Sequence, residues 1–492
     1  MSAYIDVANW LKLPDKPPDD QEGNGGPYYS PPENQPFEEM WEKFFAIHKP
    51  PAFGSQMRQQ FFPLLTGNLP ASTNPDLSPA TTPNRPLPSP SRRVTFLAHG
   101  SYGATARPSL DVARQWSLTM EASPVRFFYE TLFPYLVRSQ RSVAKLVGAS
   151  PEDCVLVTNV EVGMGAVFSS ILLHPGDKIV AFDVTYQAVL FAAQRSCERA
   201  GAELLTMRMT FPVTKESVLT DVRKFLDGQA SQGGKIRLAV LQHITSPTAI
   251  VLPVKDLVRV FHERDIPVMI DGAHAIGQLP LALADLNADY YVSNGHKWLC
   301  SPRGTAILHV RRDQQSGLNP LVATWGHPYS ASLAARFIWQ GTADYSAQLA
   351  FYTTVRFWEW LGYERTIKRN AELARWCGRV LVDAWETNLL VEEGEMTKCS
   401  MRTIRIPPPY KGVADGSKEI PLGDILFARY GIEVPFFTFR DARWVRVSTH
   451  MYNEKEDCLL LGRCVLDALG FPSSHRGYTV LETARRENNS RL

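Results

Sequence analysis

Between residues 154 and 310, short β-rich runs alternate with amphipathic helical segments, and this alternation restricts the possible folds strongly. Parallel strands need helical crossovers that cover the sheet, so the pattern predicts an α/β fold with a mostly parallel, doubly wound sheet. The expected strands are 154–158, 178–183, 238–244, 267–271, 290–294 and 305–310. The expected helices are 108–122, 137–148, 186–200, 214–227 and 254–264.

The rest of the chain divides by composition. Residues 1–92 are expected to form an N-terminal extension, poorly ordered over its first 40 residues and ending in a Pro/Ser/Thr-rich linker. Aromatic residues at helical spacing within 37–65 predict helix that docks on the main body. A large domain is predicted over 93–345, a smaller α+β domain over 346–475 and a flexible tail over 476–492. The smaller domain is expected to hold helices at 346–384 and 453–469 and strands at 399–407 and 443–448.

Composition argues against several partner classes. The chain is 44% hydrophobic and 21% charged with a formal net charge of +2, so neither nucleic acid nor a membrane surface is an expected partner. No apolar run is long enough to span a bilayer, and the N-terminus lacks the regions of a secretion signal. The seven cysteines stand singly, which predicts reduced thiols, an intracellular location and no zinc site.

Two charged residues follow neighbouring apolar strands. Asp271 ends the run that begins at 267, and Lys297 follows the run 290–292 after a polar turn. Ligands of such sheets bind beyond the carboxyl ends of the strands. A lysine there can form a Schiff base with an aldehyde cofactor, and a carboxylate can keep the ring nitrogen protonated, as in pyridoxal phosphate enzymes. The alternatives are a surface lysine and a turn-capping carboxylate, but the apolar context favours the functional interpretation.

Further candidates follow from their places in the predicted elements. His274 follows Asp271 by three residues and can reach the phenolic oxygen of the cofactor; the alternative is a structural histidine. The helix start at Glu161 and Val162 offers backbone N–H groups to a phosphate. It is not a dinucleotide fingerprint, because Phe168 stands in place of the third glycine, and no Walker A motif is present.

Each of two further residues has both a functional and a structural interpretation. Arg446 lies in the apolar strand-like run 444–448, where a buried guanidinium requires an anion, either a substrate carboxylate or a structural partner. Tyr186 begins a predicted helix, where its ring either stacks on the cofactor or belongs to the core. Both alternatives stay open for both residues.

The C-terminus carries a targeting pattern. Ser490-Arg491-Leu492 is a variant of the Ser-Lys-Leu peroxisomal signal, and the preceding segment is polar. We therefore expect recognition by the peroxisomal import receptor. A chance match, with a cytoplasmic location, is the alternative.

These residues together resemble the class V aminotransferase family of pyridoxal phosphate (PLP) fold type I, in particular its branch of isopenicillin N epimerases and fungal cysteine-sulfoxide lyases. The resemblance covers roughly residues 94–470. It implies a large domain with a mostly parallel sheet, a smaller α+β C-terminal domain, and pyridoxal 5'-phosphate as cofactor. The matching segments are FLAHGSYGATARP, SPVRFFYE, TNVEVGMGAV, QHITSPTAIVLPV, IDGAHAIGQLPL, SNGHKWLCSPRGTAILHV, WQGTADYSAQLA and VRVSTHMYN.

The resemblance implies a role for each matching residue. Lys297 is implied as the Schiff-base lysine, Asp271 as the partner of the ring nitrogen and His274 as the residue facing the phenolic oxygen. The other implied cofactor contacts are Tyr186, Asn294, His296, Glu161, Val162 and Thr342, and the implied substrate contacts are Arg446, as carboxylate anchor, and Ser246. Thr342 is implied to reach the neighbouring subunit's site, which predicts an obligate homodimer.

The implied reaction starts at Cα of an amino acid and can then end in several ways. Elimination of the carbon–sulfur lyase type or epimerisation, in amino-acid-derived secondary metabolism, is favoured. Transamination and cyclisation through an elimination product are alternatives. Persulfide-forming desulfuration is not expected, because no cysteine lies between residues 418 and 446. The alternative from another class is a non-catalytic binding protein of this fold, against which the complete Lys, Asp and Arg set argues.

Overall fold

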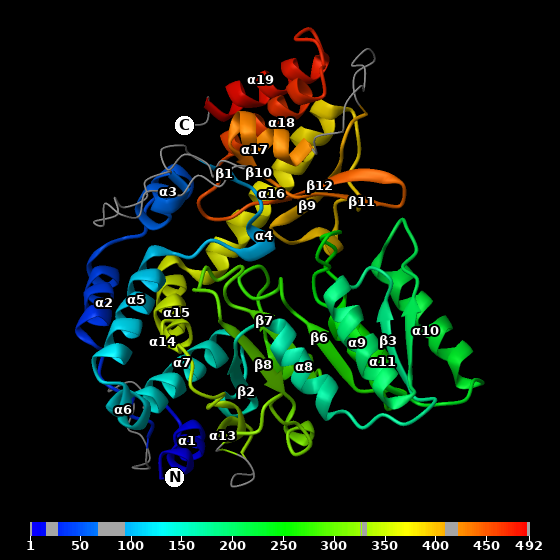
Figure 1. Ribbon diagram of the computed structural model, residues 1–492. Coiled ribbons are helices and arrows are strands. Elements are labelled where there is room, and N and C mark those ends of the chain that lie inside the picture. Colours follow the sequence, from blue (N-terminus) through cyan, green and yellow to red (C-terminus); the bar gives the residue numbers. More distant parts are fainter. Residues whose placement is uncertain are drawn as a thin grey trace, which may run out of the picture. The chain divides into compact units, whose positions relative to one another are not determined.

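The computed structural model of the chain describes residues 2–15, 28–66, 94–324, 326, 332–408 and 422–489 (Figure 1). Almost all of the predicted linker and the C-terminal Ser490-Arg491-Leu492 lie outside these residues. The chain forms two compact units, which do not coincide with the predicted domain ranges. The first comprises Met1–Lys49, Ala104–Ser246 and Ile250–Glu364, and the second comprises Pro50–Gly103, Pro247–Ala249 and Arg365–Leu492.

The first unit is built around a seven-stranded sheet in the order β2-β8-β7-β6-β5-β3-β4. The strands are β2 (Cys154–Val157), β3 (Lys178–Phe182), β4 (Glu203–Met207), β5 (Ile236–Gln242), β6 (Val268–Asp271), β7 (Tyr290–Asn294) and β8 (Ala306–Val310). The strands from β4 to β7 pair in parallel, and only β8 is antiparallel to its neighbours. The predicted α/β class with a mostly parallel sheet is confirmed. Edge strand β4 was missed, because its half-exposed residues lack a continuous apolar run.

Helices connect and cover these strands. In the first unit they are α5 (Arg107–Ala122), α6 (Pro124–Arg126), α7 (Leu132–Leu146), α8 (Val160–Ser170), α9 (Gln187–Ala200), α10 (Lys215–Ala230), α11 (Val254–His262), α12 (Leu283–Leu286), α13 (Leu333–Phe337), α14 (Ser346–Leu349) and α15 (Phe351–Leu361). Helix α8 packs on β7 and β8, α9 on β3 and β4, and α11 on β5 and β6. Helix α11 shows why: its buried side chains, Leu257, Val258 and Phe261 among them, recur at helical spacing and form one apolar face.

Over residues 2–15 and 28–40, the described part of the segment, the structure corrects the prediction that residues 1–40 are poorly ordered. Ser2–Lys12 form α1, with Val7 and Leu11 buried, and Pro36–Ile47 form α2, with Trp41 and Phe45 buried. Three ion pairs tie the segment to α7 and α15: Glu38–Arg138 at 2.5 Å, Asp15–Arg141 at 2.6 Å and Glu42–Arg356 at 3.1 Å. Order here depends on partners that are distant in sequence, which a local composition argument does not include.

The second unit is an α+β arrangement with two small sheets. One is antiparallel, in the order β11-β12-β9, from Phe436–Phe439, Ala442–Ser448 and Met401–Arg405. The other pairs β1 (Thr95–Phe96) with β10 (Ile432–Glu433) in parallel. The helices are α3 (Ser55–Phe61), α4 (His99–Tyr102), most of α16 (Tyr363–Trp385), α17 (Leu422–Tyr430), α18 (Lys455–Ala468) and α19 (Arg476–Asn489).

Helix α19 corrects the prediction of a flexible tail over 476–492. Its residues up to Asn489 are helical, and the helix packs on α18. Leu481 is buried in the core cluster of the second unit, next to Leu381 and Gly462. A few apolar residues in a mostly polar segment are therefore enough to hold this helix, and composition alone concealed them.

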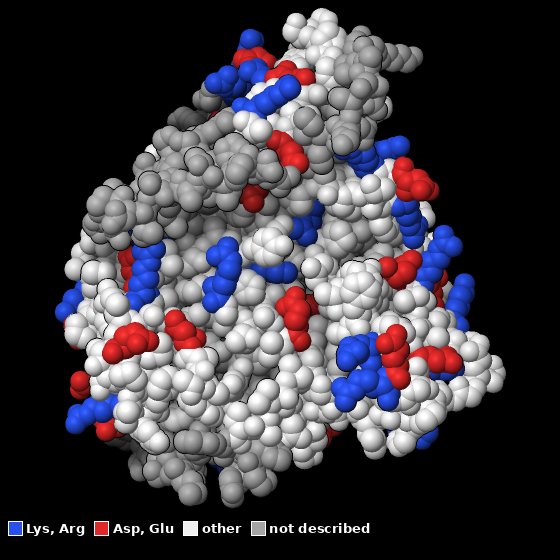
Figure 2. All heavy atoms as spheres, viewed as in Figure 1, with Lys and Arg blue, Asp and Glu red and all other residues white. Residues whose placement is uncertain are grey.

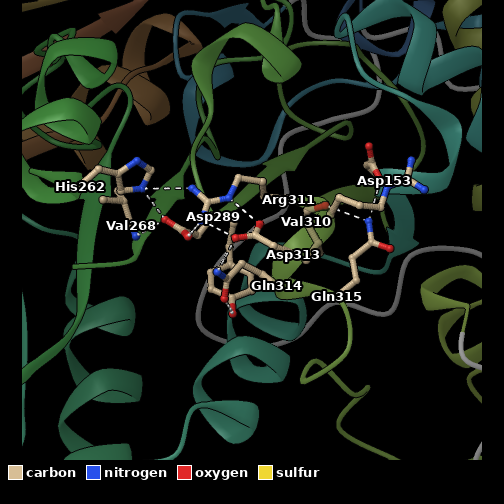
Figure 3. Close-up of polar contacts among 11 residues, drawn as sticks. Asp153, His262, Val268, Asp289, Val310, Arg311, Asp313, Gln314 and Gln315 are labelled. Carbon is tan, nitrogen blue, oxygen red and sulfur yellow. Dashed lines mark hydrogen bonds and ion pairs between the residues drawn. The ribbon is translucent and has the colours of Figure 1, made fainter. Parts of the chain in front are cut away.

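At the amino end of β6, a buried carboxylate ties three elements together (Figure 3). One oxygen of Asp289 accepts a hydrogen bond from the backbone N–H of Val268 at 2.7 Å and lies 2.7 Å from Nε2 of His262. Its other oxygen pairs with the guanidinium of Arg311 at 2.8 Å. Because these residues surround the amino end of β6, Asp289 secures the edge of the sheet opposite to the one at which ligands bind.

The described surface mixes charges of both signs. On the face shown in Figure 2, basic and acidic side chains are interspersed. Within the described ranges, the structure contains no helix that combines the length and the apolar character needed to cross a membrane.

Candidate active site

The carboxyl ends of three adjacent parallel strands carry the polar side chains of the candidate site. Gln242, Asp271 and Asn294 are the last residues of β5, β6 and β7, and all three are buried. Gln242 is in register with Asp271 across the β5–β6 pair. This is the edge at which ligands bind in open α/β sheets.

Asp271 is a buried carboxylate whose hydrogen-bond donors are neutral. Its Oδ1 accepts from the backbone N–H of Ala273 at 2.9 Å, and its Oδ2 accepts from Nε2 of Gln242 at 3.4 Å. Burial raises the pKa of Asp271, and the Ala273 hydrogen bond and the charge of Lys297 oppose that rise. A carboxylate in such surroundings is stabilised by a cationic hydrogen-bond donor.

Lys297 and His274 meet although they lie in different turns. Nζ of Lys297 is 3.3 Å from Nε2 of His274, which is buried in the turn after β6. On the other side of the imidazole, Nδ1 of His274 accepts a hydrogen bond of 3.1 Å from the indole N–H of Trp298. Trp298 was not among the predicted site residues. Its signal was an indole directly after the candidate lysine, because a buried indole N–H needs an acceptor.

The start of α8 differs in detail from the predicted phosphate site. Oδ1 of Asn159 caps the helix by accepting from the backbone N–H of Val162 at 2.8 Å. Oδ1 of Asn294 accepts from the backbone N–H of Val160 at 3.1 Å, which joins β7 to the helix. Two of the predicted phosphate contacts, Val162 and Asn294, therefore also make bonds within the protein. Glu161 is exposed in the first turn, at the positive end of the helix dipole.

Gln242 is a second residue that the sequence analysis missed. Its Nε2 contacts Asp271, while its buried Oε1 has no hydrogen-bond partner among the described residues. A buried amide oxygen of this kind is suited to accept a hydrogen bond from a ligand. Its place at the end of an apolar strand was the signal that could have identified it.

The remaining candidates of the first unit are spread over several loops. Nδ1 of His296 is 3.3 Å from the carbonyl oxygen of Thr305, and burial, together with the adjacent lysine charge, lowers the pKa of His296 to about 4. Tyr186 is the N-cap residue of α9 and is 45% exposed. Thr342 is exposed between α13 and α14, and Ser246 is half-buried after β5.

Arg446 belongs to the second unit. It lies on β12 in register with Thr403 of β9, and its side chain is buried. Its Nη2 donates a hydrogen bond of 3.2 Å to Oγ of Ser101. The arginine is therefore held on a strand with its guanidinium next to a neutral hydroxyl.

The chain matches the family model "Aminotransferase class-V" over residues 135–461. It is 32% identical over 417 residues to a putative L-cysteine desulfhydrase 1 of Oryza sativa subsp. japonica, covering 77% of this chain and 85% of the relative. It is 30% identical over 380 residues to an isopenicillin N epimerase of Amycolatopsis lactamdurans, covering 74% and 92%. Its fold resembles a cystine C–S lyase in complex with its product cysteine persulfide, with a TM-score of 0.66, 19% identity, and 76% and 97% coverage.

The mostly parallel sheet with polar residues at its ligand-binding edge defines an α/β protein of PLP fold type I. The chain belongs to the class V aminotransferase family. It is a PLP-dependent enzyme, as the sequence analysis predicted, and its cofactor is pyridoxal 5'-phosphate. The residues at the sheet edge fit this group: a buried carboxylate suits a cationic ring nitrogen, a neighbouring amine suits an aldehyde, and a helix start suits a phosphate.

Proposed function

We propose that the chain acts at Cα of an amino acid, by carbon–sulfur elimination or by epimerisation, with elimination favoured. The observation that carries the proposal is the contact between Nζ of Lys297 and His274, beside the buried Asp271. The relatives named as cysteine desulfhydrases support elimination, and the isopenicillin N epimerases support the alternative. The lack of a cysteine between residues 418 and 446 argues against a persulfide-forming mechanism.

When bound, pyridoxal phosphate supplies an aldehyde that reacts with amines and a ring that withdraws electrons from Cα. In the proposed mechanism the amine of Lys297 would hold the cofactor, and it would also be the general base that takes the proton from Cα. Asp271 would keep a proton on the ring nitrogen, and Nε2 of His274 would donate a hydrogen bond to the phenolic oxygen.

The same proposal assigns the other predicted contacts. Arg446 anchors the substrate carboxylate through its rigid fork of donors, and Ser246 lies near the substrate. Tyr186 stacks on the ring, while the phosphate is bound by residues at the start of α8 and after β7: Asn294, His296, Glu161 and Val162. These roles rest on the matching segments and on the positions of the residues within their own units.

The decisive experiment offers candidate amino acids, L-cysteine first, to the holoenzyme in deuterated water. A keto acid with released sulfide supports elimination, and deuterium at an inverted Cα supports epimerisation. Pyridoxamine phosphate with one equivalent of keto acid per site means transamination and overturns the proposal. Borohydride reduction followed by peptide mapping tests the lysine, because a pyridoxyl group on any residue other than Lys297 contradicts its role.

The anchor is tested separately with Arg446→Ala. We expect KM for the substrate to rise at least about tenfold, because a charge-assisted bidentate contact is lost, while the visible absorbance of the bound cofactor stays unchanged. Arg443→Ala, three residues before it on β12 and at an exposed site, is the matched control. Equal KM values for Arg446→Ala and the wild type would remove the anchor role.

We also propose a homodimer in which Thr342 contacts the cofactor phosphate of the neighbouring subunit, and import into the peroxisome through residues 490–492. The homodimer rests on the matching segment around Thr342, whose side chain is exposed. For targeting, a fluorescent fusion that retains Ser490-Arg491-Leu492 at its C-terminus should enter peroxisomes, whereas one lacking these three residues should not. Equal distribution of both fusions would contradict the import proposal.

A further inference from the structure

We infer that Trp298 sets the tautomer of His274, so that the single imidazole proton resides on Nε2, the nitrogen that faces Lys297. The inference deepens the proposed function, in which Nε2 also serves the phenolic oxygen of the cofactor. Trp298 acts through His274 and is therefore a positioning residue. The imidazole of His274 makes two contacts, one of 3.1 Å from Nδ1 to the indole nitrogen of Trp298 and one of 3.3 Å from Nε2 to Nζ of Lys297.

Only one nitrogen of the His274 imidazole can accept the hydrogen bond from the indole. An indole N–H is a donor only, so Nδ1 of His274 must accept the hydrogen bond from Trp298 and carries no proton. A neutral imidazole has one N–H, which is then on Nε2. An imidazolium ion carries protons on both nitrogens and cannot accept from the indole. The Trp298 contact therefore selects one tautomer and also disfavours protonation of the ring.

The indole of Trp298 is also firmly held. Trp298 and His274 are both buried, so an indole N–H that lost its acceptor would remain without water. The backbone beside Trp298 packs closely on Gly277, which has φ of +81° and where a Cβ atom would lie 2.7 Å from the carbonyl oxygen of Trp298. On the other side, the carbonyl oxygen of His274 accepts a hydrogen bond of 2.7 Å from Nε2 of Gln278. Both partners of the contact are thus restrained.

Lys297 faces the other nitrogen of the imidazole. Its Nζ lies 3.3 Å from an Nε2 that carries a proton, and an ammonium group has no lone pair with which to accept that proton. A hydrogen bond from Nε2–H to Nζ therefore forms only with the neutral amine, the nucleophilic form that an aldehyde requires, and not with the charged ammonium whose electrostatic effect reaches Asp271 and His296. When the cofactor is bound, the same N–H is a donor suited to an anionic phenolic oxygen. The Trp298 contact therefore provides an Nε2–H donor in both states of the site, to the neutral amine of Lys297 without cofactor and to the phenolic oxygen with cofactor.

A purely packing role for Trp298 makes a different prediction. If Trp298 only filled space, its substitution would lower the stability of the fold but leave the protonation equilibrium of the bound cofactor unchanged. Trp298→Phe separates the two, because phenylalanine keeps an aromatic ring and removes the N–H. The matched control is Trp385→Phe in the second unit, where a buried indole N–H donates to the carbonyl oxygen of Gly462 at 3.1 Å.

The test measures the pH midpoint of the visible absorbance change of the holoenzyme. We expect Trp298→Phe to raise this midpoint by about one pH unit, a tenfold change in proton affinity. Without the indole, the proton of His274 is no longer fixed on Nε2, and the anionic phenolic oxygen loses that hydrogen-bond donor. Trp385→Phe should leave the midpoint unchanged. In a His274→Gln background, Trp298→Phe should cause no further shift, because the two residues act through one contact. An unshifted midpoint in folded, loaded Trp298→Phe enzyme overturns the inference.

A second measurement depends neither on a Trp298 variant nor on the cofactor. Nitrogen NMR of wild-type protein labelled with ¹⁵N-histidine, assigned with His274→Gln, should show an unprotonated Nδ1 and a protonated Nε2 for His274 before cofactor is added. A protonated Nδ1 overturns the inference even if the enzyme is active. If this tautomer is found but no amino acid is turned over, the proposed function fails while the Trp298 assignment stands.

Discussion

At the scale of single residues, burial sets the protonation states on which the site depends. It raises the pKa of Asp271, so that a carboxylate there is favoured mainly when a cation is close. It lowers the pKa values of His243, His296 and His309 to about 4, so these histidines are neutral near pH 7. The same physical cause therefore has opposite effects on acids and bases, and in both it favours the uncharged form.

Two buried aspartates at opposite ends of β6 give a matched pair of substitutions. Asp271→Asn should lower kcat by at least about 100-fold, because the cofactor ring nitrogen would lose its proposed negative partner, while thermal stability is retained. Asp289→Asn should instead destabilise the fold by about 3 kcal/mol, because Arg311 and His262 lose the buried carboxylate with which they pair. The measurements are steady-state kinetics and chemical denaturation. If Asp271→Asn destabilised the fold and Asp289→Asn lowered kcat, the structural role would belong to the carboxyl end of β6 and the functional role to its amino end.

Stability should depend on pH through His309, which is buried on β8 with its pKa lowered to about 4. The unfolded chain binds this proton near pH 6.5 and the folded chain only near pH 4, so stability is complete above about 6.5 and falls as pH is lowered between these values. The loss approaches about 3 kcal/mol at pH 4. His309→Leu should make the slope of unfolding free energy against pH shallower by about one proton in this window. An unchanged slope would show that His309 titrates normally.

At the scale of elements, the N-terminal segment is part of the first unit because its carboxylates neutralise arginines of α7 and α15. The guanidinium of Arg138 also lies over the rings of Tyr135 and Tyr352, at 4.7 and 4.1 Å from their centroids. Burial raises the pKa of Glu38, while Arg138 opposes that rise. The pair therefore depends on both members, since each alone would be a buried, uncompensated charge.

Adjacent glutamates on α2 test this pairing. Glu38→Gln should lower the free energy of unfolding by about 3 kcal/mol, because Arg138 remains buried without its anion. Glu39→Gln is the control: its pair with Lys43 is exposed, and its loss should cost at most about 0.5 kcal/mol. Denaturant titration of both variants gives the comparison. Similar costs for the two would show that the N-terminal segment contributes no specific stability.

At the scale of the whole molecule, each active site of the proposed homodimer contains residues of both subunits. Sedimentation velocity should give a dimer, and Thr342→Ala should weaken cofactor binding by about tenfold, the loss of one charge-assisted contact. Mixed dimers of Lys297→Ala and Thr342→Ala subunits contain one site with both intact residues if the site is shared. They should therefore recover activity at limiting cofactor, up to half of the wild-type value. A monomer, or no recovery on mixing, would remove the role of Thr342.

Local patterns were sufficient to predict much of the fold and to place the central residues of the candidate site. Strands β2, β3, β5, β6, β7 and β8 were predicted because their apolar runs end in polar residues within the same short segment. Lys297, His274 and Asp271 were predicted from their places after two such runs, and the structure brings them to one edge of the sheet. Edge strand β4 and helix α19 were not predicted, because half-exposed or mostly polar elements have a weak periodic signal.

The order of residues along the chain determined the α/β class through its periodicity, and it determined the family and the cofactor through the resemblance of its motifs to those of a known family, all within segments of a few dozen residues. Only the tertiary structure decided that Glu38 neutralises an arginine 100 residues away and that the indole of Trp298 holds His274 on the side opposite Lys297. Each of these contacts joins side chains from different elements. Their energies depend on distance and burial, which exist only once the elements have packed.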